Sequence, residues 1–258
     1  MFAKLFKAEM PDEDTIAWLF DTYQWAISNF NAEVFFDETQ LVTPTNDHFP
    51  GTHSSVHDAA VQVFEQVKAL AGLQHWPCEV MDQNSCTTLE APKVLIEGAL
   101  RGHKGITPTD VPPDQKLVVT YDSTDMSDPE VMIANYAHVL AHYLGSMSEE
   151  VPPGGLENWP HITEVLAVFM GFGIMFSNSA LKFKGGCGSC GSHFVDRENY
   201  LSERDITYAL AIFCQLKNIP ARAVNKHLKK SLRGYFSQAM KHVASHSNQL
   251  EKLRHMKP

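Results

Sequence analysis

Two histidines four residues apart are the residues with the clearest chemical potential in this chain. His138 and His142 belong to the run Asn-Tyr-Ala-His-Val-Leu-Ala-His-Tyr-Leu-Gly, in which most other residues are apolar. Residues at positions i and i+4 lie one above the other on the same face of an α-helix. Two imidazoles placed in this way can bind one metal ion, and a shared ion would offset the cost of burying them. The spacing therefore predicts a metal-binding helix.

A carboxylate in the next apolar run is the expected third ligand. Glu164 opens the most apolar segment of the chain, where a lone carboxylate is costly unless it is paired or bound to a cation. His161, three residues earlier, could ligate in its place or orient it. We expect one Zn²⁺ ion held by His138, His142 and Glu164. The alternative is that both histidines are core residues, hydrogen-bonded to backbone carbonyls or to Glu164 without a metal.

These two helices resemble the gluzincin type of zincin metallopeptidase, in which a His-Glu-x-x-His helix is followed by a glutamate ligand on a later helix. The chain is more similar to uncharacterised bacterial proteins that share segments like Thr-Glu-Val-Leu-Ala-Val-Phe-Met-Gly-Phe-Gly and Tyr-Leu-Ser-Glu-Arg-Asp-Ile-Thr-Tyr-Ala-Leu. The resemblance covers roughly residues 115–216, with a weaker likeness at 41–50. It implies a zincin-like fold with a strand at 116–121 beside the site.

The chain departs from that pattern at the position of the general base. Where the peptidase motif has glutamate, this sequence has Val139. In zinc hydrolases the carboxylate accepts the proton of the metal-bound water, and valine cannot do so. Glu149, Glu150 or Glu157 in the following loop could substitute, but their spacing does not show it. No catalytic residue is therefore assigned.

Two functions are compatible with these residues. The first is a zinc-binding, metallopeptidase-like hydrolase that is degenerate or uses an unusual base. The second is a non-catalytic binding or scaffold module that retains a zincin fold and a structural metal. A peptide or protein partner fits both functions, and the chain leaves its oligomeric state undetermined.

A glycine-rich loop holds the second candidate site. Cys187 and Cys190 form a Cys-x-x-Cys turn, with His193 three residues later. A structural zinc site normally has four ligands, and the chain has no second Cys-x-x-Cys to complete the set. We therefore expect a surface loop with incidental cysteines. A structural zinc site and a redox pair remain the alternatives.

Composition excludes several classes of protein. The 258 residues are 44% hydrophobic and include 15 Phe, which excludes disorder as the main state. Five scattered cysteines do not form a disulfide scaffold and favour a reducing compartment, so we expect a cytoplasmic protein. The formal net charge of −9 argues against a general nucleic-acid binder. The longest apolar stretch, 165–176, is too short to span a membrane and is expected to be a core helix.

Charge is distributed unevenly along the chain. Residues 217–258 contain ten Lys or Arg and one acidic residue, whereas residues 1–216 contain eleven basic and twenty-nine acidic residues. The basic helices are expected to pack against the acidic body or to face solvent. A patch for nucleic acid or an anionic membrane is the alternative.

The patterning predicts one α+β domain over residues 1–258, mostly helical with a small sheet and a zincin-like metal helix. It is divided into N-terminal helices at 1–75, a small sheet at 76–123, metal-site helices at 127–218 and basic C-terminal helices at 219–258. Apolar periodicity places the main helices at 12–30, 55–72, 128–145, 161–180 and 202–218. Ser202 and Asp205 have the spacing of a helix cap.

Overall fold

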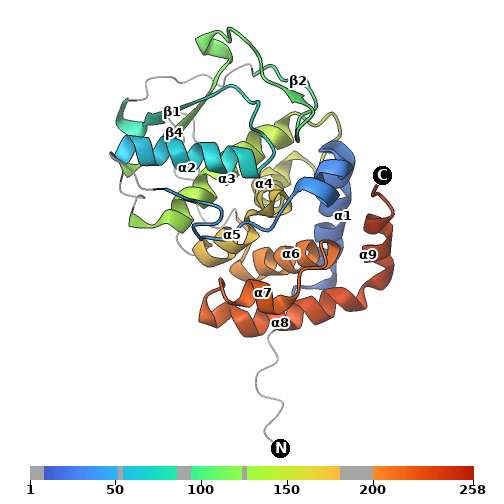
Figure 1. Ribbon diagram of the computed structural model, residues 1–258. Coiled ribbons are helices and arrows are strands. Elements are labelled where there is room, and N and C mark those ends of the chain that lie inside the picture. Colours follow the sequence, from blue (N-terminus) through green and yellow to red (C-terminus); the bar gives the residue numbers. More distant parts are fainter. Residues whose placement is uncertain (1–8, 52–54, 86–93, 124–126, 181–199) are drawn as a thin grey trace, which may run out of the picture.

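The computed structural model describes residues 9–51, 55–85, 94–123, 127–180 and 200–258 (Figure 1). The α-helices are α1 (Glu13–Asn29), α2 (Val56–Leu70), α3 (Pro129–Ser146), α4 (Trp159–Ala167), α5 (Gly173–Ser179), α6 (Glu203–Leu216), α7 (Ala221–Asn225), α8 (Lys230–Ser245) and α9 (Ser247–Arg254). The strands are β1 (Cys78–Asp82), β2 (Glu97–Gly98), β3 (Gly105–Ile106) and β4 (Leu117–Tyr121). The expected fold class, a mostly helical α+β domain with little sheet, is confirmed.

Helices α3 to α6 form the centre of the molecule. Helix α3 packs against α2, α4 and α5, and α6 packs against α5 and α8 (Figure 1). Every residue of α5 is buried, as are most residues of α3 and α6. This central group arises because its sequences are apolar on nearly all faces, which only a position inside the fold can satisfy.

The sheet portion consists of two separate strand pairs. Strand β1 pairs in parallel with β4, with Val80 opposite Val119, while β2 and β3 form a short antiparallel pair. Strand β4 has its alternate residues buried and contacts α3. The expected strand at 116–121 is therefore present, beside the helix that carries the histidine pair.

The apolar segment expected as one helix at 161–180 is broken. It begins as α4, passes through a π-helical turn at Val168–Phe172 and continues as α5. Gly171 causes the break, because its φ of 104° lies in the left-handed region that favours glycine. The run Leu156–Ser179 is long and apolar enough to cross a membrane, but all of its most apolar window is buried inside the molecule. That is also how the core helix of a globular domain behaves.

The basic C-terminal helices pack on the body through apolar residues. Helix α8 buries one face, which includes Leu232, Phe236 and Val243, and this helix packs on α6. Two ion pairs join the basic segment to acidic residues: Lys229 Nζ lies 3.4 Å from Glu203 Oε1, and Lys257 Nζ lies 2.7 Å from Asp37 Oδ1. Part of the positive charge of residues 217–258 is therefore paired with acidic residues of the rest of the chain.

Candidate functional site

The two predicted histidines lie on α3, as their spacing requires. His138 is 5% exposed and His142 is partly buried. Burial lowers the pKa of His138 to about 3, with a further contribution from the neighbouring His142 ring. Burial also lowers the pKa of His142. Both rings are therefore neutral at pH 7, which is the protonation state that a metal ion requires of its histidine ligands.

A tryptophan at the start of α4 determines which ring nitrogen of His142 carries the proton. Trp159 donates its Nε1–H to His142 Nδ1 over 3.0 Å, and the two rings meet edge-on with centroids 5.9 Å apart. An indole N–H is only a donor, so His142 Nδ1 must be the acceptor. A neutral imidazole has one nitrogen lone pair that can accept a hydrogen bond or bind a metal, and here that lone pair, on Nδ1, accepts the hydrogen bond from the indole N–H. The ring proton is therefore on Nε2, and His142 has no lone pair for a metal while this bond exists.

Glu164 lies on α4, in the buried position that the sequence predicts. It is 2% exposed, and its Oε2 accepts a hydrogen bond from the backbone N–H of Leu201 over 2.7 Å. The ring of the preceding residue, Tyr200, lies 6.0 Å from the ring of His138. His138 and Glu164 therefore both adjoin the segment that leads into α6. The Glu164 carboxylate therefore stabilises that segment through its hydrogen bond to Leu201.

These contacts do not fit a zinc ion as the chain is arranged. Among the residues that the structure describes, no three His, Cys, Asp or Glu side chains are grouped so that they could hold a metal. His142 Nδ1 accepts a hydrogen bond from the Trp159 N–H, and Glu164 Oε2 accepts one from the Leu201 N–H. A carboxylate has several lone pairs, so the bond to His142 is the one that opposes a metal. A zinc site here would require His142 to release Trp159, and its ring would also have to change tautomer if Nε2 were the ligand.

The position of the missing general base is buried. Val139 is 4% exposed and belongs to the hydrophobic core. The structure thus places an apolar side chain where a zincin would have its proton acceptor. Of the three glutamates that could replace the base, Glu149 and Glu150 lie beyond the end of α3, where they line a pocket, and Glu157 is exposed in the turn before α4.

His161 is directed to a different part of the molecule. Its ring meets the ring of Trp18 on α1 edge-on, with centroids 6.3 Å apart. Burial lowers its pKa, and the nearby Asp205 carboxylate on α6 opposes that shift. His161 therefore faces α1 and α6. The second candidate site, Cys187, Cys190 and His193, lies outside the described residues.

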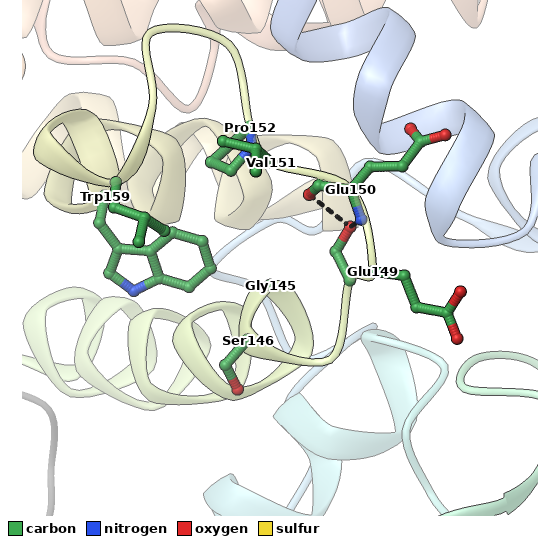
Figure 2. A pocket seen from close by; sticks show the side chains of 9 residues that line it. Gly145, Ser146, Glu149, Glu150, Val151, Pro152 and Trp159 are labelled. Carbon is green, nitrogen blue, oxygen red and sulfur yellow. Dashed lines mark hydrogen bonds between the residues drawn. The ribbon is translucent and has the colours of Figure 1, made fainter.

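A pocket of about 380 Å³ opens at the C-terminal end of α3 (Figure 2). Trp159 forms one of its walls. Figure 2 shows the nitrogen edge of this indole turned toward α3. Glu149 and Glu150 lie on the side of the pocket opposite Trp159, and their carboxylates extend away from the indole. The indole thus contacts His142 through its N–H and lines the pocket with its rings. The lining residues are Gly145, Ser146, Ser148, Glu149, Glu150, Val151, Pro152, Leu156 and Trp159.

Two further tryptophans hold in place the loop that follows α3 and lines the pocket. On α1, Trp18 donates its Nε1–H to the carbonyl of Pro153 over 2.9 Å, and Trp25 donates to the carbonyl of Glu150 over 3.2 Å. Asn29 Nδ2 donates to the Glu150 carboxylate over 2.9 Å. In the sequence, these tryptophans fall on the apolar face of the helix predicted at 12–30. Their separation of seven residues, which places them on one side of α1, is the signal that could have indicated a shared role.

The pocket combines negative charge with exposed apolar surface. Glu149 and Glu150 are exposed, and the C-terminal end of α3 adds partial negative charge from its last carbonyls. Val151 is 70% exposed and Leu156 is 72% exposed. These two are among the few large apolar side chains that the described residues present to solvent. Such a surface favours a cationic group with apolar neighbours.

No protein-family model, no curated protein and no solved structure matches the chain.

Proposed function

We propose that this protein is a non-catalytic binding module whose histidine-bearing helix has a structural role. The hydrogen bond from Trp159 to His142 Nδ1 is the observation that carries the proposal. It commits the lone pair of His142 to an indole that also forms a pocket wall. In this proposal the helix pair that resembles a zincin site supports a recognition pocket.

The valine next to His138 supports the same proposal. A metal-bound water is deprotonated efficiently only when a carboxylate lies within hydrogen-bond reach of it. The residue at that point of α3 is Val139, inside the core. General-base assistance typically contributes about 10²–10⁴-fold in rate. A hydrolase built on these residues would lack that contribution.

The partner that suits the pocket is a protein segment with one lysine or arginine flanked by apolar residues. The cation would lie near Glu149 and Glu150, while its apolar neighbours would cover Val151 and Leu156. The loop is already held by Trp18 and Trp25, so little ordering is needed on binding. Charge complementarity at this exposed rim would act chiefly on association rate and specificity.

The pocket is tested with a short fluorescent peptide that has a central lysine between leucines. We expect Glu149→Lys to weaken its binding about tenfold or more, because the added ammonium repels the peptide's cation. Fluorescence anisotropy at low salt measures the affinity, which should also fall as salt is raised. The matched control is Glu97→Lys, which reverses an exposed charge on β2 and should leave the affinity unchanged. Equal affinities for the wild type and Glu149→Lys would refute the proposal that the peptide binds at this pocket.

A zinc-dependent, metallopeptidase-like hydrolase is the second candidate. It is favoured by the neutral state of both histidines and by the buried Glu164 on the adjacent helix. Zinc binding by His138, His142 and Glu164 would then need Trp159 to release His142. This step distinguishes the two candidates experimentally.

A reducing compartment, the cytoplasm, is the proposed location. Cys78 and Cys214 are both free thiols in the described part of the chain. Burial raises the pKa of the Cys78 thiol to about 12, so this side chain stays protonated and unreactive. The two cysteines therefore serve as packing residues and need no oxidising environment.

A further inference from the structure

A second His-x-x-x-His pair lies at the end of α8. His242 and His246 have the same i, i+4 spacing as the pair on α3, and both are only partly buried. Their ring centroids are 4.9 Å apart. The two imidazoles are thus close enough to reach one ion. This pair lies far along the chain from the zincin-like motif and shares none of its residues.

The hydrogen bond of His246 determines its tautomer. His246 Nδ1 lies 2.9 Å from the backbone carbonyl oxygen of His242. A carbonyl oxygen only accepts, so Nδ1 must carry the proton. In the neutral ring the lone pair is therefore on Nε2. Histidines that bind metals almost always donate their other ring N–H to an oxygen in this way, which orients the ring and increases its basicity.

His242 also has an oxygen atom as the hydrogen-bond partner of its Nδ1. Its Nδ1 lies 2.8 Å from the hydroxyl of Tyr208, which is on α6. A phenol hydroxyl can either donate or accept, so the ring can carry its proton on Nδ1 and present the Nε2 lone pair. The contrast with His142 is clear, because the indole of Trp159 can only donate. In the pair on α8, the hydrogen bond of His246 is of the kind that metal ligands make, and that of His242 is compatible with it.

We propose that His242 and His246 bind one divalent transition-metal ion through their Nε2 atoms. Imidazole nitrogen suits Ni²⁺, Cu²⁺ and Zn²⁺, whereas Mg²⁺ and Ca²⁺ prefer oxygen. Within the described ranges no third His, Cys, Asp or Glu completes the group, so the two imidazoles are the ligands that we assign. His246 ends α8 and directly precedes α9, which packs on α1 and α6. The ion would therefore stabilise the corner between α8 and α9.

Titration of untagged protein with Ni²⁺ tests the site. We expect calorimetry to show one saturable equivalent in the wild type, lost in His242→Ala and in His246→Ala. Tyr208→Phe removes the oxygen that orients His242 and should weaken binding about tenfold or more. His255→Ala, a change at an exposed histidine outside the pair, should bind as the wild type does. His142→Ala should also bind normally, which separates this site from the pair on α3.

A thermal measurement provides an independent readout. Ni²⁺ should raise the melting temperature of the wild type and of His255→Ala, because the ion binds only the folded chain. It should not raise that of His246→Ala or of the more conservative His246→Gln, whose melting temperatures without Ni²⁺ show whether they fold. Undiminished Ni²⁺ binding in folded His246→Ala and His246→Gln would overturn the proposal. Loss of binding in His142→Ala would overturn it too, since the ion would then lie on α3.

Discussion

Replacing Val139 with glutamate is expected to destabilise the fold by about 3–5 kcal/mol, the cost of an unpaired charge in the core. The side chain it replaces is buried on α3 and is part of the hydrophobic core. The new carboxylate would have no bound cation to compensate for lost hydration, since His142 is committed to Trp159. Urea unfolding of the wild type and Val139→Glu measures the difference. Val139→Ile, which adds one apolar methylene at the same position, should cost less than the glutamate, about 1–3 kcal/mol.

The same variant distinguishes a binding module from a dormant hydrolase. If zinc were bound by His138, His142 and Glu164, the glutamate would lie beside the metal and restore the general base. Near-normal stability, together with cleavage of casein that needs zinc and stops with chelator, would then be observed. We expect neither, with or without added zinc. Either result would favour the zinc-dependent hydrolase over the binding module.

Gly171→Ala is expected to cost about 3 kcal/mol or more. Gly171 adopts a φ of 104°, and a Cβ built on it would lie 2.1 Å from the backbone carbonyl oxygen of Gln40. The loop cannot easily move away, because the Val42 N–H donates to the Gly171 carbonyl over 3.0 Å. Backbone strain and a backbone clash therefore act together at the junction between α4 and α5. Thermal or urea unfolding gives the magnitude.

Gly155→Ala is the matched control for that change. Gly155 also has a positive φ, of 76°, but a Cβ there would meet nothing within 4 Å. Its substitution should cost only the backbone strain, about 1 kcal/mol. Equal unfolding midpoints for the two variants would show that the contact between Gly171 and Gln40 has no energetic effect.

Local patterns were enough to predict most helices. The expected helix at 12–30 is α1, and the one at 128–145 is α3, because both have continuous apolar faces and clear starts. The predicted cap of α6 is present: Ser202 Oγ accepts from the Asp205 N–H over 3.1 Å. The break at Gly171 was missed, because glycine within an apolar run can equally serve close helix packing. Only the passage of Gln40 past this point explains the positive φ.

The candidate site was predicted in its residues but not in its contacts. Helical spacing placed His138 and His142 on one buried helix, and apolarity placed Glu164 inside the core. The direction of the Trp159 indole depends on how α4 packs against α3, and no local pattern encodes that. The pocket was missed for the same reason, because its walls come from the end of α3, the following loop and the start of α4. The tautomer of His142 therefore depends on tertiary packing.

Nitrogen NMR of ¹⁵N-histidine-labelled protein tests the central claim most directly, because it shows which ring nitrogen carries the proton. The signals of His142 are assigned by their loss in His142→Gln. We expect His142 to carry its proton on Nε2, with Nδ1 accepting from Trp159, and one equivalent of Zn²⁺ to leave these signals unchanged. In Trp159→Phe this tautomer should no longer be enforced. A wild-type His142 with its proton on Nδ1, and an Nε2 signal that shifts when Zn²⁺ is added, would contradict the structural role and establish a zinc ligand.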